Sequence, residues 1–585
     1  MEQKSLLVGR KLEIERLQTV CDSPKSEFLA LYGRRRVGKT FLIREFFNYH
    51  FSFHLTGLAK ADTSQQLFNF HNSLERQSHL TFEKQPPHWL EAFQRLIIHL
   101  EQLNTPEKKI VFFDEMPWLD TRGSDFLTAL EHFWNSWATN RKDIVLIATG
   151  SAASWIINEL INSPGGLHNR ITQYLEIKPF TLGEAEAMLA SKNVGLNRYQ
   201  VVQLYMALGG IPFYLEAAQI GLSAAQNIQY LFFDKNAPLK NEFFNLYRSL
   251  FKKHDVYEKL VAILATKTMG FQRRELAKYP GISSGGTLTK VLNDLEKSGF
   301  ITAYSDLYNK QKNTLYRLSD YYTAFYFRFI QTGQYRGEQA WVNLLDNPSH
   351  RAWQGFAFEQ ICIDHVAQIK KALGISGILS SHVAWSGSSG TQKAQLDLLI
   401  DRRDEVINIC EAKFSINPYT ISKDYAGKLR EKIGVFKAAT NTKKSVFLTF
   451  ITTYGVAKNE HALQLVQNEV TMDDLFDTGP ISIVQLSTQD VANKNIETIT
   501  SEAVYDTQWS TSEKILYILK AAGLPMSLST IHETICALDG IEVGSEKAKK
   551  LMVNITATLS YKLKKDQELE RIKGKNEYQY TLKEI

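Results

Sequence analysis

The sequence predicts a multidomain α/β protein whose amino-terminal domain is built on a parallel sheet. The chain has 585 residues, which is too long for one core if domains hold roughly 100–200 residues each. A glycine-rich loop lies between an apolar run at 28–32 and an amphipathic run at 41–47. Two further apolar runs, 109–114 and 143–149, end in polar residues, as buried parallel strands do when they carry a site at their carboxyl edge.

The glycine-rich loop, Gly33-Arg-Arg-Arg-Val-Gly38-Lys39-Thr40, matches a phosphate-binding P-loop without a mismatch. Its glycines allow backbone N–H groups to turn toward phosphates, and the following helix adds the positive end of its dipole. Lys39 is expected to reach the β- and γ-phosphates of ATP, and Thr40 to ligate Mg²⁺. The alternative is a chance glycine turn with an exposed lysine. The residues expected at the nucleotide are Gly33, Arg34, Arg35, Arg36, Val37, Gly38, Lys39 and Thr40.

The apolar run that begins at Lys109 ends in Asp114 and Glu115. Open α/β sheets bind ligands at the carboxyl edge of their strands, so both acids are candidates for the nucleotide site. Asp114 is expected to hold Mg²⁺ through water, and Glu115 to orient and deprotonate the attacking water. Acids also often begin solvated loops. After a P-loop, however, this pair favours hydrolysis over binding alone.

The run 143–149 leads to a further polar residue, Ser151, which is expected to sense the γ-phosphate or place the water. Arg170 follows Gly165-Gly166 and precedes a strand-like stretch at 174–180. It could stabilise transition-state charge on a neighbouring subunit as an arginine finger, which would imply a homo-oligomer. A surface arginine in a loop fits the same pattern.

Together with Val8-Gly9-Arg10 and Leu208-Gly209-Gly210-Ile211-Pro212, these motifs resemble the archaeal-type ATPases related to AAA+ and STAND proteins. Such chains occur in archaea and many bacteria and carry a winged helix and a nuclease-like carboxyl-terminal part. The resemblance covers roughly residues 1–480. It implies that Val8–Arg10 packs near the adenine and that 208–212 marks a helical lid. The implied domains are a P-loop, AAA+-like ATPase core at 1–180 and a helical lid at 181–250.

Composition describes an ordinary globular chain: 44% hydrophobic and 22% charged residues, with a net charge of +6. This charge permits an anionic partner without requiring one. The four cysteines are far apart, so zinc is not expected. The sequence contains no run of eighteen apolar residues and no signal-peptide pattern at its start, so no membrane association and a cytoplasmic location are expected.

Residues 251–335 show three helical periods followed by a hairpin-like stretch at 301–317, which is the pattern of a winged helix. Lys290, Lys297, Lys310 and Lys312 could contact DNA phosphates. Winged helices in such ATPases also serve as packing modules between domains. A second winged-helix-like unit is expected at 506–585, where Ser510 and Glu513 have capping-box spacing. Its lysines, which form a nucleic-acid footprint or a solvated face, are Lys547, Lys549, Lys550, Lys562, Lys564, Lys565, Lys573 and Lys575.

A second chemical site is expected within 340–485. The apolar run 395–400 carries Asp397, and the run 406–414 carries Glu411 and Lys413, which are two residues apart and so share one face of a strand. Acids on apolar strands are costly unless a divalent ion compensates their charge. Asp397 and Glu411 are expected to hold Mg²⁺, while Lys413 positions or deprotonates a water. Glu359, on an apolar-periodic helix upstream, could supply a third acid.

This second constellation resembles the PD-(D/E)xK nuclease superfamily, which implies a restriction-endonuclease-like α/β domain. Leu396 stands where the superfamily usually has a proline before the first acid. Tyr425 and Lys428 fall where members often place a substrate-contacting side chain. The alternative is an ordinary acid–lysine ion pair on a surface hairpin.

The sequence as a whole predicts an ATP-hydrolysing protein that couples nucleotide turnover to DNA binding and Mg²⁺-dependent cleavage. The alternative is an ATP-controlled DNA-binding regulator, or a helper ATPase, whose nuclease-like domain is catalytically silent.

Overall fold

A computed structural model describes residues 7–162, 170–251, 253–282, 285–304, 314–333, 335, 339–345 and 347–477, with shorter runs between 510 and 582. The chain forms two compact units, residues 1–485 and 486–585.

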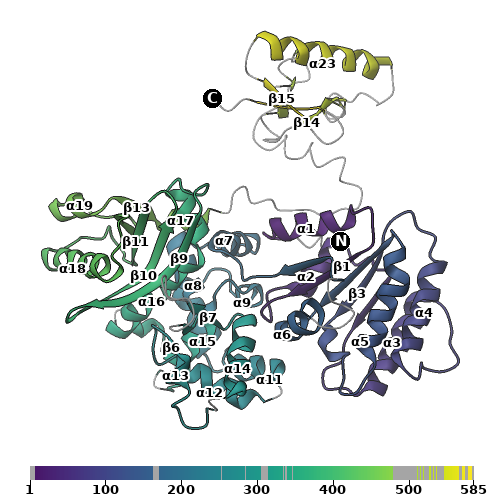
Figure 1. The fold of residues 1–585 in the computed structure, drawn as a ribbon, viewed down its shortest axis with the longest axis horizontal. Helices are drawn as coiled ribbons and strands as arrows, with labels where there is room; N and C mark the ends of the chain where they lie inside the picture. Colours follow the sequence, from purple (N-terminus) through teal and green to yellow (C-terminus); the bar gives the residue numbers. More distant parts are fainter. Residues whose placement is uncertain are drawn as a thin grey trace. The chain divides into compact units, whose positions relative to one another are not determined.

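The amino-terminal part of the first unit contains a five-stranded sheet in the order β2-β3-β4-β1-β5. All neighbouring strands are parallel, which confirms the predicted parallel sheet (Figure 1). The strands are β1 Glu27–Tyr32, β2 Phe53–Thr56, β3 Lys109–Asp114, β4 Ile144–Thr149 and β5 Gln173–Glu176. The run expected at 174–180 is a strand only to Glu176, the last residue paired with β1.

Helices cover this sheet and bury its aromatic side chains. Phe28 packs against Trp134, and Phe93 against Phe113 and Phe133. β3 and β4 are buried at every position, as expected for central strands of a parallel sheet. The helices are α1 Lys11–Cys21, α2 Lys39–Phe46, α3 Thr63–Ser78, α4 Trp89–Gln102, α5 Phe126–His132 and α6 Ala153–Trp155.

A helical segment follows the sheet. Its first helix begins after Thr181, whose side chain forms a capping box with Glu184. The helices are α7 Leu182–Ser191, α8 Arg198–Leu208, α9 Pro212–Glu216, α10 Ala224–Ile228 and α11 Glu242–Leu250.

Three helices and a small antiparallel sheet come next: α12 His254–Leu264, α13 Arg273–Leu276 and α14 Gly286–Lys297, with β6 Phe271–Gln272, β7 Ile301–Tyr304 and β8 Leu315–Leu318. The strand order is β6-β8-β7. Lys290 is exposed on α14. Lys297, which could contact a DNA phosphate, donates to Asn158 Oδ1 at 2.7 Å, so the end of α14 packs on the amino-terminal part. Lys310 and Lys312 lie outside the described residues.

The last part of the first unit holds a mixed sheet in the order β13-β12-β11-β10-β9 (Figure 1). Its strands are β9 Ser380–Ser389, β10 Gln392–Arg402, β11 Val406–Lys413, β12 Ser445–Thr452 and β13 Asn468–Thr471. β10 pairs antiparallel with β11. Helices α15 Tyr321–Phe325, α16 Pro348–Asp364, α17 Val366–Ala372, α18 Lys423–Thr440 and α19 Glu460–Leu465 accompany it.

The second unit contains helix α23 Glu546–Lys565 and the strands β14 Met526–Ser527, β15 Leu569–Lys573 and β16 Tyr578–Leu582. β15 and β16 pair antiparallel. Lys549 and Lys550 are exposed on α23, whereas Glu513 and Lys575 lie outside the described residues. Among the described helices of the chain, none is both long and apolar enough to cross a membrane.

Candidate nucleotide site and acidic centre

The P-loop connects β1 to α2, as predicted. Gly33 has a φ of 142°, and a Cβ there would come within 2.3 Å of the Ile177 carbonyl oxygen. Gly38 has a φ of 89° and precedes the first turn of α2. Both positions therefore require glycine, the first for space and conformation and the second for conformation.

Lys39 is buried beneath the loop. Its Nζ donates to the carbonyl oxygens of Gly33 and Arg34, at 3.0 and 3.1 Å. Burial lowers the pKa of Lys39 to about 8, although Glu115 and Asp114 oppose this shift. A phosphate held by the loop would offer this ammonium group a stronger acceptor than two neutral carbonyls.

Thr40 and Asp114 lie together at the carboxyl edge of the sheet. Thr40 Oγ1 donates to Asp114 Oδ1 at 2.8 Å, and Thr149 Oγ1 donates to the same oxygen at 2.6 Å. Arg44 Nη2 lies 3.8 Å from Asp114 Oδ2. A hydroxyl beside a buried carboxylate is a suitable donor set for Mg²⁺ bound to ATP, so the residues present fit the predicted ion.

Glu115 and Ser151 form the other predicted pair. Glu115 has a φ of 50°. Its carboxylate accepts hydrogen bonds from both the backbone N–H and the hydroxyl of Ser151. The carboxylate is thereby held at the end of β3, beside the loop. Arg170 is exposed and does not line the cavity that lies over the P-loop.

A cavity of about 1240 Å³ lies over the loop. Arg10 lines it and is fixed by hydrogen bonds from Nη2 to Val37 O and from Nη1 to Lys178 O, at 2.9 and 2.6 Å. Leu7, Val8, Phe180, Pro212 and Phe213 supply an apolar wall suited to a base. Three lining cations had no sequence motif to reveal them: Lys60, Lys192 and Arg248.

The three loop arginines do not act alike. Arg35 and Arg36 line the cavity, but the Arg34 side chain is directed away from it. Arg34 is buried against Tyr214 and Phe300 and forms an ion pair with Asp320. The predicted contact of Arg34 with the nucleotide is therefore not made by its side chain. Its guanidinium group instead contacts a buried carboxylate and two aromatic rings.

Residues 7–218 match a family model described as an ATPase domain predominantly from Archaea. This region is an archaeal-type ATPase domain. The match begins at the Leu7–Arg10 segment and ends just after α9, so it spans the five-stranded sheet and the first part of the helical segment.

Individual proteins similar to this chain were also found. An uncharacterized protein of Methanocaldococcus jannaschii, MJECL04, is 24% identical over 372 residues, covering 63% of this chain and 78% of the relative. An uncharacterized ATP-binding protein of the same organism, MJ0423, is 49% identical over 41 residues, which cover 7% of this chain and 70% of the relative.

Two solved structures are similar at low identity. The Walker-type ATPase PABY2304 of Pyrococcus abyssi has a TM-score of 0.40 and 19% identity, covering 55% of this chain and 96% of that one. The ORC2 protein of Aeropyrum pernix has a TM-score of 0.36 and 14% identity, covering 56% and 94%. Both TM-scores are below 0.5. The assignment of the ATPase domain therefore rests on the family match and not on these structures.

Downstream of the ATPase domain, a buried carboxylate is surrounded by cations. Lys413 Nζ lies 2.7 Å from Glu411 Oε1, and Lys432 Nζ, from α18, lies 3.2 Å from Oε2. The Tyr425 hydroxyl donates to Oε1. Burial alone would raise the pKa of Glu411, but the two lysines and the tyrosine outweigh it and lower the pKa. The sequence suggested Lys428 as a substrate-contacting residue of this helix, but Lys428 is exposed. Lys432 is the lysine of α18 that contacts Glu411.

Glu359 and Asp397 lie close enough to Glu411 to interact with it electrostatically. Burial and the charge of the neighbouring acids raise the pKa of both Glu359 and Asp397. The pairing of β9 with β10 is irregular between Leu396 and Leu399, a segment that contains Asp397. Such irregularities redirect a side chain, often beside a functional site. We call Glu359, Asp397, Glu411 and Lys413 the acidic centre.

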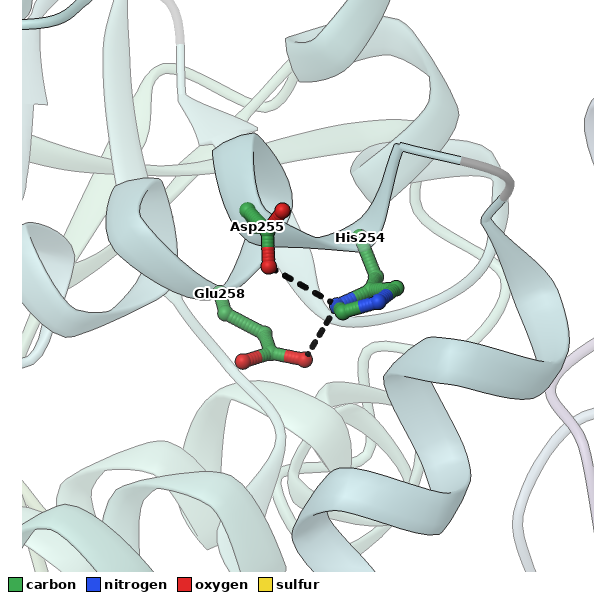
Figure 2. A group of neighbouring side chains, drawn as sticks. All are labelled: His254, Asp255 and Glu258. Carbon is green, nitrogen blue, oxygen red and sulfur yellow. Dashed lines mark hydrogen bonds and ion pairs between the residues drawn. The ribbon is translucent and has the colours of Figure 1, made fainter.

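The structure does not gather the three predicted metal ligands of the acidic centre into one cage. Their oxygens do not all lie within 4.8 Å of one another. Among the described residues, the one group of three potential ligands that meets this distance is His254, Asp255 and Glu258, on α12 (Figure 2). There His254 Nδ1 lies 3.2 Å from Asp255 and 2.9 Å from Glu258, so ion pairing within a helix accounts for the group.

Several contacts join the helical segment to the part that holds the acidic centre. His365 Nε2 accepts from the backbone N–H of Leu182, at the start of α7, at 2.9 Å. Tyr199 of α8 stacks on Phe414, directly after Lys413, with ring centroids 4.8 Å apart. The archaeal-type ATPase domain therefore contacts both ends of the sequence that builds the acidic centre.

Proposed function

We propose that this chain couples ATP turnover at the P-loop to DNA binding and to Mg²⁺-dependent cleavage of nucleic acid at the acidic centre. The observation that carries the proposal is the composition of that centre. Asp397, Glu411 and Lys413 on the sheet and Glu359 on α16 lie within electrostatic reach of one another, in a part of the chain that contacts the ATPase domain.

Two residues of the ATPase site have the clearest roles in the proposal. Lys39 would bind the phosphates, and Glu115, fixed by Ser151, would orient and deprotonate the attacking water. Thr40 and Asp114 would hold Mg²⁺, which supplies charge neutralisation for the phosphates when bound.

At the acidic centre, Asp397 and Glu411 would hold Mg²⁺, whose chemistry there is to polarise a phosphodiester. Lys413 would give up its ion pair with Glu411 to position a water for attack. Glu359 would add a third carboxylate from α16.

Support for DNA binding comes from α12–α14 and their small sheet, which have the order of helices and strands of a winged helix. Lys290 is exposed on α14 and available to a phosphate. Lys297 supports the packing role that such modules also have, because it is bonded to Asn158. We therefore assign DNA contact to the exposed Lys290 side of α14.

The test is incubation of the purified chain with Mg²⁺, ATP and plasmid DNA. The wild-type chain should nick or linearise the plasmid, and Glu411→Ala should abolish cleavage while ATP hydrolysis continues. Lys428→Ala is the matched control, because this exposed lysine lies on the same helix as Tyr425 and Lys432. A wild-type chain that never cleaves DNA or RNA in any nucleotide state contradicts the proposal.

A second candidate function is an ATP-controlled DNA-binding regulator whose acidic centre is silent. It is favoured by Glu411, whose two oxygens are already occupied by two lysines and a tyrosine, and by the separation of the three acids. Under this function, DNA affinity changes with the bound nucleotide while Glu411→Ala leaves every measured activity intact.

A further inference from the structure

A second cavity, of about 450 Å³, lies between the end of α12, strand β8, α15 and one face of α16. The α16 residues that line it, Trp353, Phe356, Ala357 and Gln360, are spaced as one helical face requires. The remaining lining residues come from α8, the turn after α12, β8 and the region of α15, and none of them belongs to the acidic centre.

The charges that line this cavity are all positive. They are Lys267, Arg317 and Arg328, and no described carboxylate lines the cavity with them. Lys267 is paired with Glu275 at 3.3 Å. Arg317 is half-buried and Arg328 is exposed. Within the described part of the chain, neither guanidinium group makes a hydrogen bond or an ion pair within 4 Å, although Arg317 lies near enough to Glu359, Asp397 and Asp364 to act electrostatically on the pKa of each. Two such groups at one cavity leave paired donors available to an oxyanion.

The other lining residues include aromatic and uncharged polar side chains. Phe356 is 45% exposed, and Trp353 and Tyr321 also line the cavity. Thr266, Thr268 and Ser319 add hydroxyl groups. An exposed ring and two guanidinium groups at one cavity suit a ligand with a flat base and a phosphate, because every nucleobase presents a face for stacking.

We propose that this cavity binds a nucleoside monophosphate, with the phosphate on Arg317 and Arg328 and the base against Phe356. Its volume lies in the range of ordinary small-ligand sites, roughly 300–1,000 Å³. The nucleotide can be free or can be the phosphorylated end of a strand. α16 supplies Gln360 to the cavity and its neighbour Glu359 to the acidic centre, so a strand end seated here would lie beside that centre.

The test uses the full chain with Lys39→Ala, which removes the main phosphate contact of the P-loop, in EDTA. Thymidine 5′-monophosphate is titrated by calorimetry. We expect saturable binding that weakens about tenfold or more when Arg317→Met and Arg328→Met are combined. Arg351→Met is the matched control, because this exposed arginine of α16 does not line the cavity. It should leave the affinity unchanged.

Further arms separate the ligand's parts and its sources. Phe356→Ala should weaken binding of the nucleotide but leave binding of inorganic phosphate unchanged. Oligothymidylate with a 5′-phosphate, compared with its 5′-hydroxyl form, shows whether the site takes strand ends. If the arginine substitutions weaken binding of the free nucleotide but not of the 5′-phosphorylated oligonucleotide, the site takes free nucleotides. Either result supports the proposal.

Three results would overturn it: no binding of the nucleotide at millimolar concentration, equal affinity in the double arginine variant, or equal affinity for inorganic phosphate and nucleotide. If the double variant melts at a lower temperature, the nucleotide affinity is compared between the parent chain and Arg328→Met alone, because this side chain is exposed. Glu411→Ala should bind the nucleotide as the parent chain does, so failure of cleavage and failure of this site are distinguishable.

Discussion

Arg34 Nη2 lies 2.7 Å from Asp320 Oδ1, and both side chains are almost completely buried. Asp320 also accepts from the backbone N–H of Thr323 and so caps α15. The backbone of Arg34 accepts from Lys39. Arg34 thus links Lys39 to the segment that follows β8. A rearrangement of the loop would have a direct path to that segment.

Replacing Arg34 with methionine should destabilise the first unit by about 3–5 kcal/mol, because Asp320 would remain buried without its partner. Thermal or urea unfolding measures the effect. Asp320→Asn in the same chain should restore part of the loss, since the uncompensated charge is then gone. Arg35→Met is the control: it should alter nucleotide affinity more than stability, because Arg35 lines the cavity. Equal stability of Arg34→Met and wild type would contradict the linkage.

Glu115→Gln should reduce ATP hydrolysis at least about a hundredfold while ATP binding is retained, since the amide keeps a polar group beside Ser151 but cannot accept a proton. Lys39→Ala should lose both hydrolysis and tight binding. Turnover and equilibrium binding of ATP measure the two effects separately. Lys60→Ala, which removes a lysine at the rim of the same cavity, should cost less than either. Unaltered turnover in Glu115→Gln would exclude it as the general base.

Two lysines of α14 provide a paired test of DNA contact. Lys290→Gln should lower DNA affinity and the salt dependence of binding by about one phosphate contact. Lys297→Gln should leave the salt dependence unchanged and lower the thermal midpoint slightly, because it breaks the contact with Asn158. Binding titrations at several salt concentrations decide. The assignment of α14 to DNA fails if Lys290→Gln and wild type have the same salt dependence.

His365 should make the stability of the first unit sensitive to acid. Burial lowers its pKa from 6.5 to about 4, so the unfolded chain binds more protons between these values. The neutral imidazole therefore contributes stability above pH 6.5 that is lost as the pH falls toward 4, by about 3 kcal/mol over this window. His365→Gln should lack this dependence.

Asp364, adjacent to His365, opposes the effect, because burial raises its pKa to about 6. The comparison between wild type and His365→Gln removes this contribution, since Asp364 is present in both. Unfolding measured from pH 4 to pH 7 should therefore give curves that converge at low pH. Parallel curves would show that His365 does not titrate in this window.

The local features of the archaeal-type ATPase domain were accessible to sequence reasoning. The strand–loop–helix of the P-loop, the acids that end β3 and the capping box at Thr181 depend on residues a few positions apart. Their geometry follows from backbone preferences and helix periodicity. The hairpin that carries Asp397 and Glu411 was predictable for the same reason, because alternating strands around a turn leave few arrangements.

The sequence by itself determined which charged groups the chain carries and which local element presents each one. Only the tertiary structure decided their partners: Arg34 with Asp320, Lys432 with Glu411, and Lys297 with Asn158. A buried charge takes whichever opposite charge the packed elements bring near it, and that choice depends on contacts between distant segments. The spacing of Glu359, Asp397 and Glu411 was undetermined for the same reason, since a helix and two strands set it together.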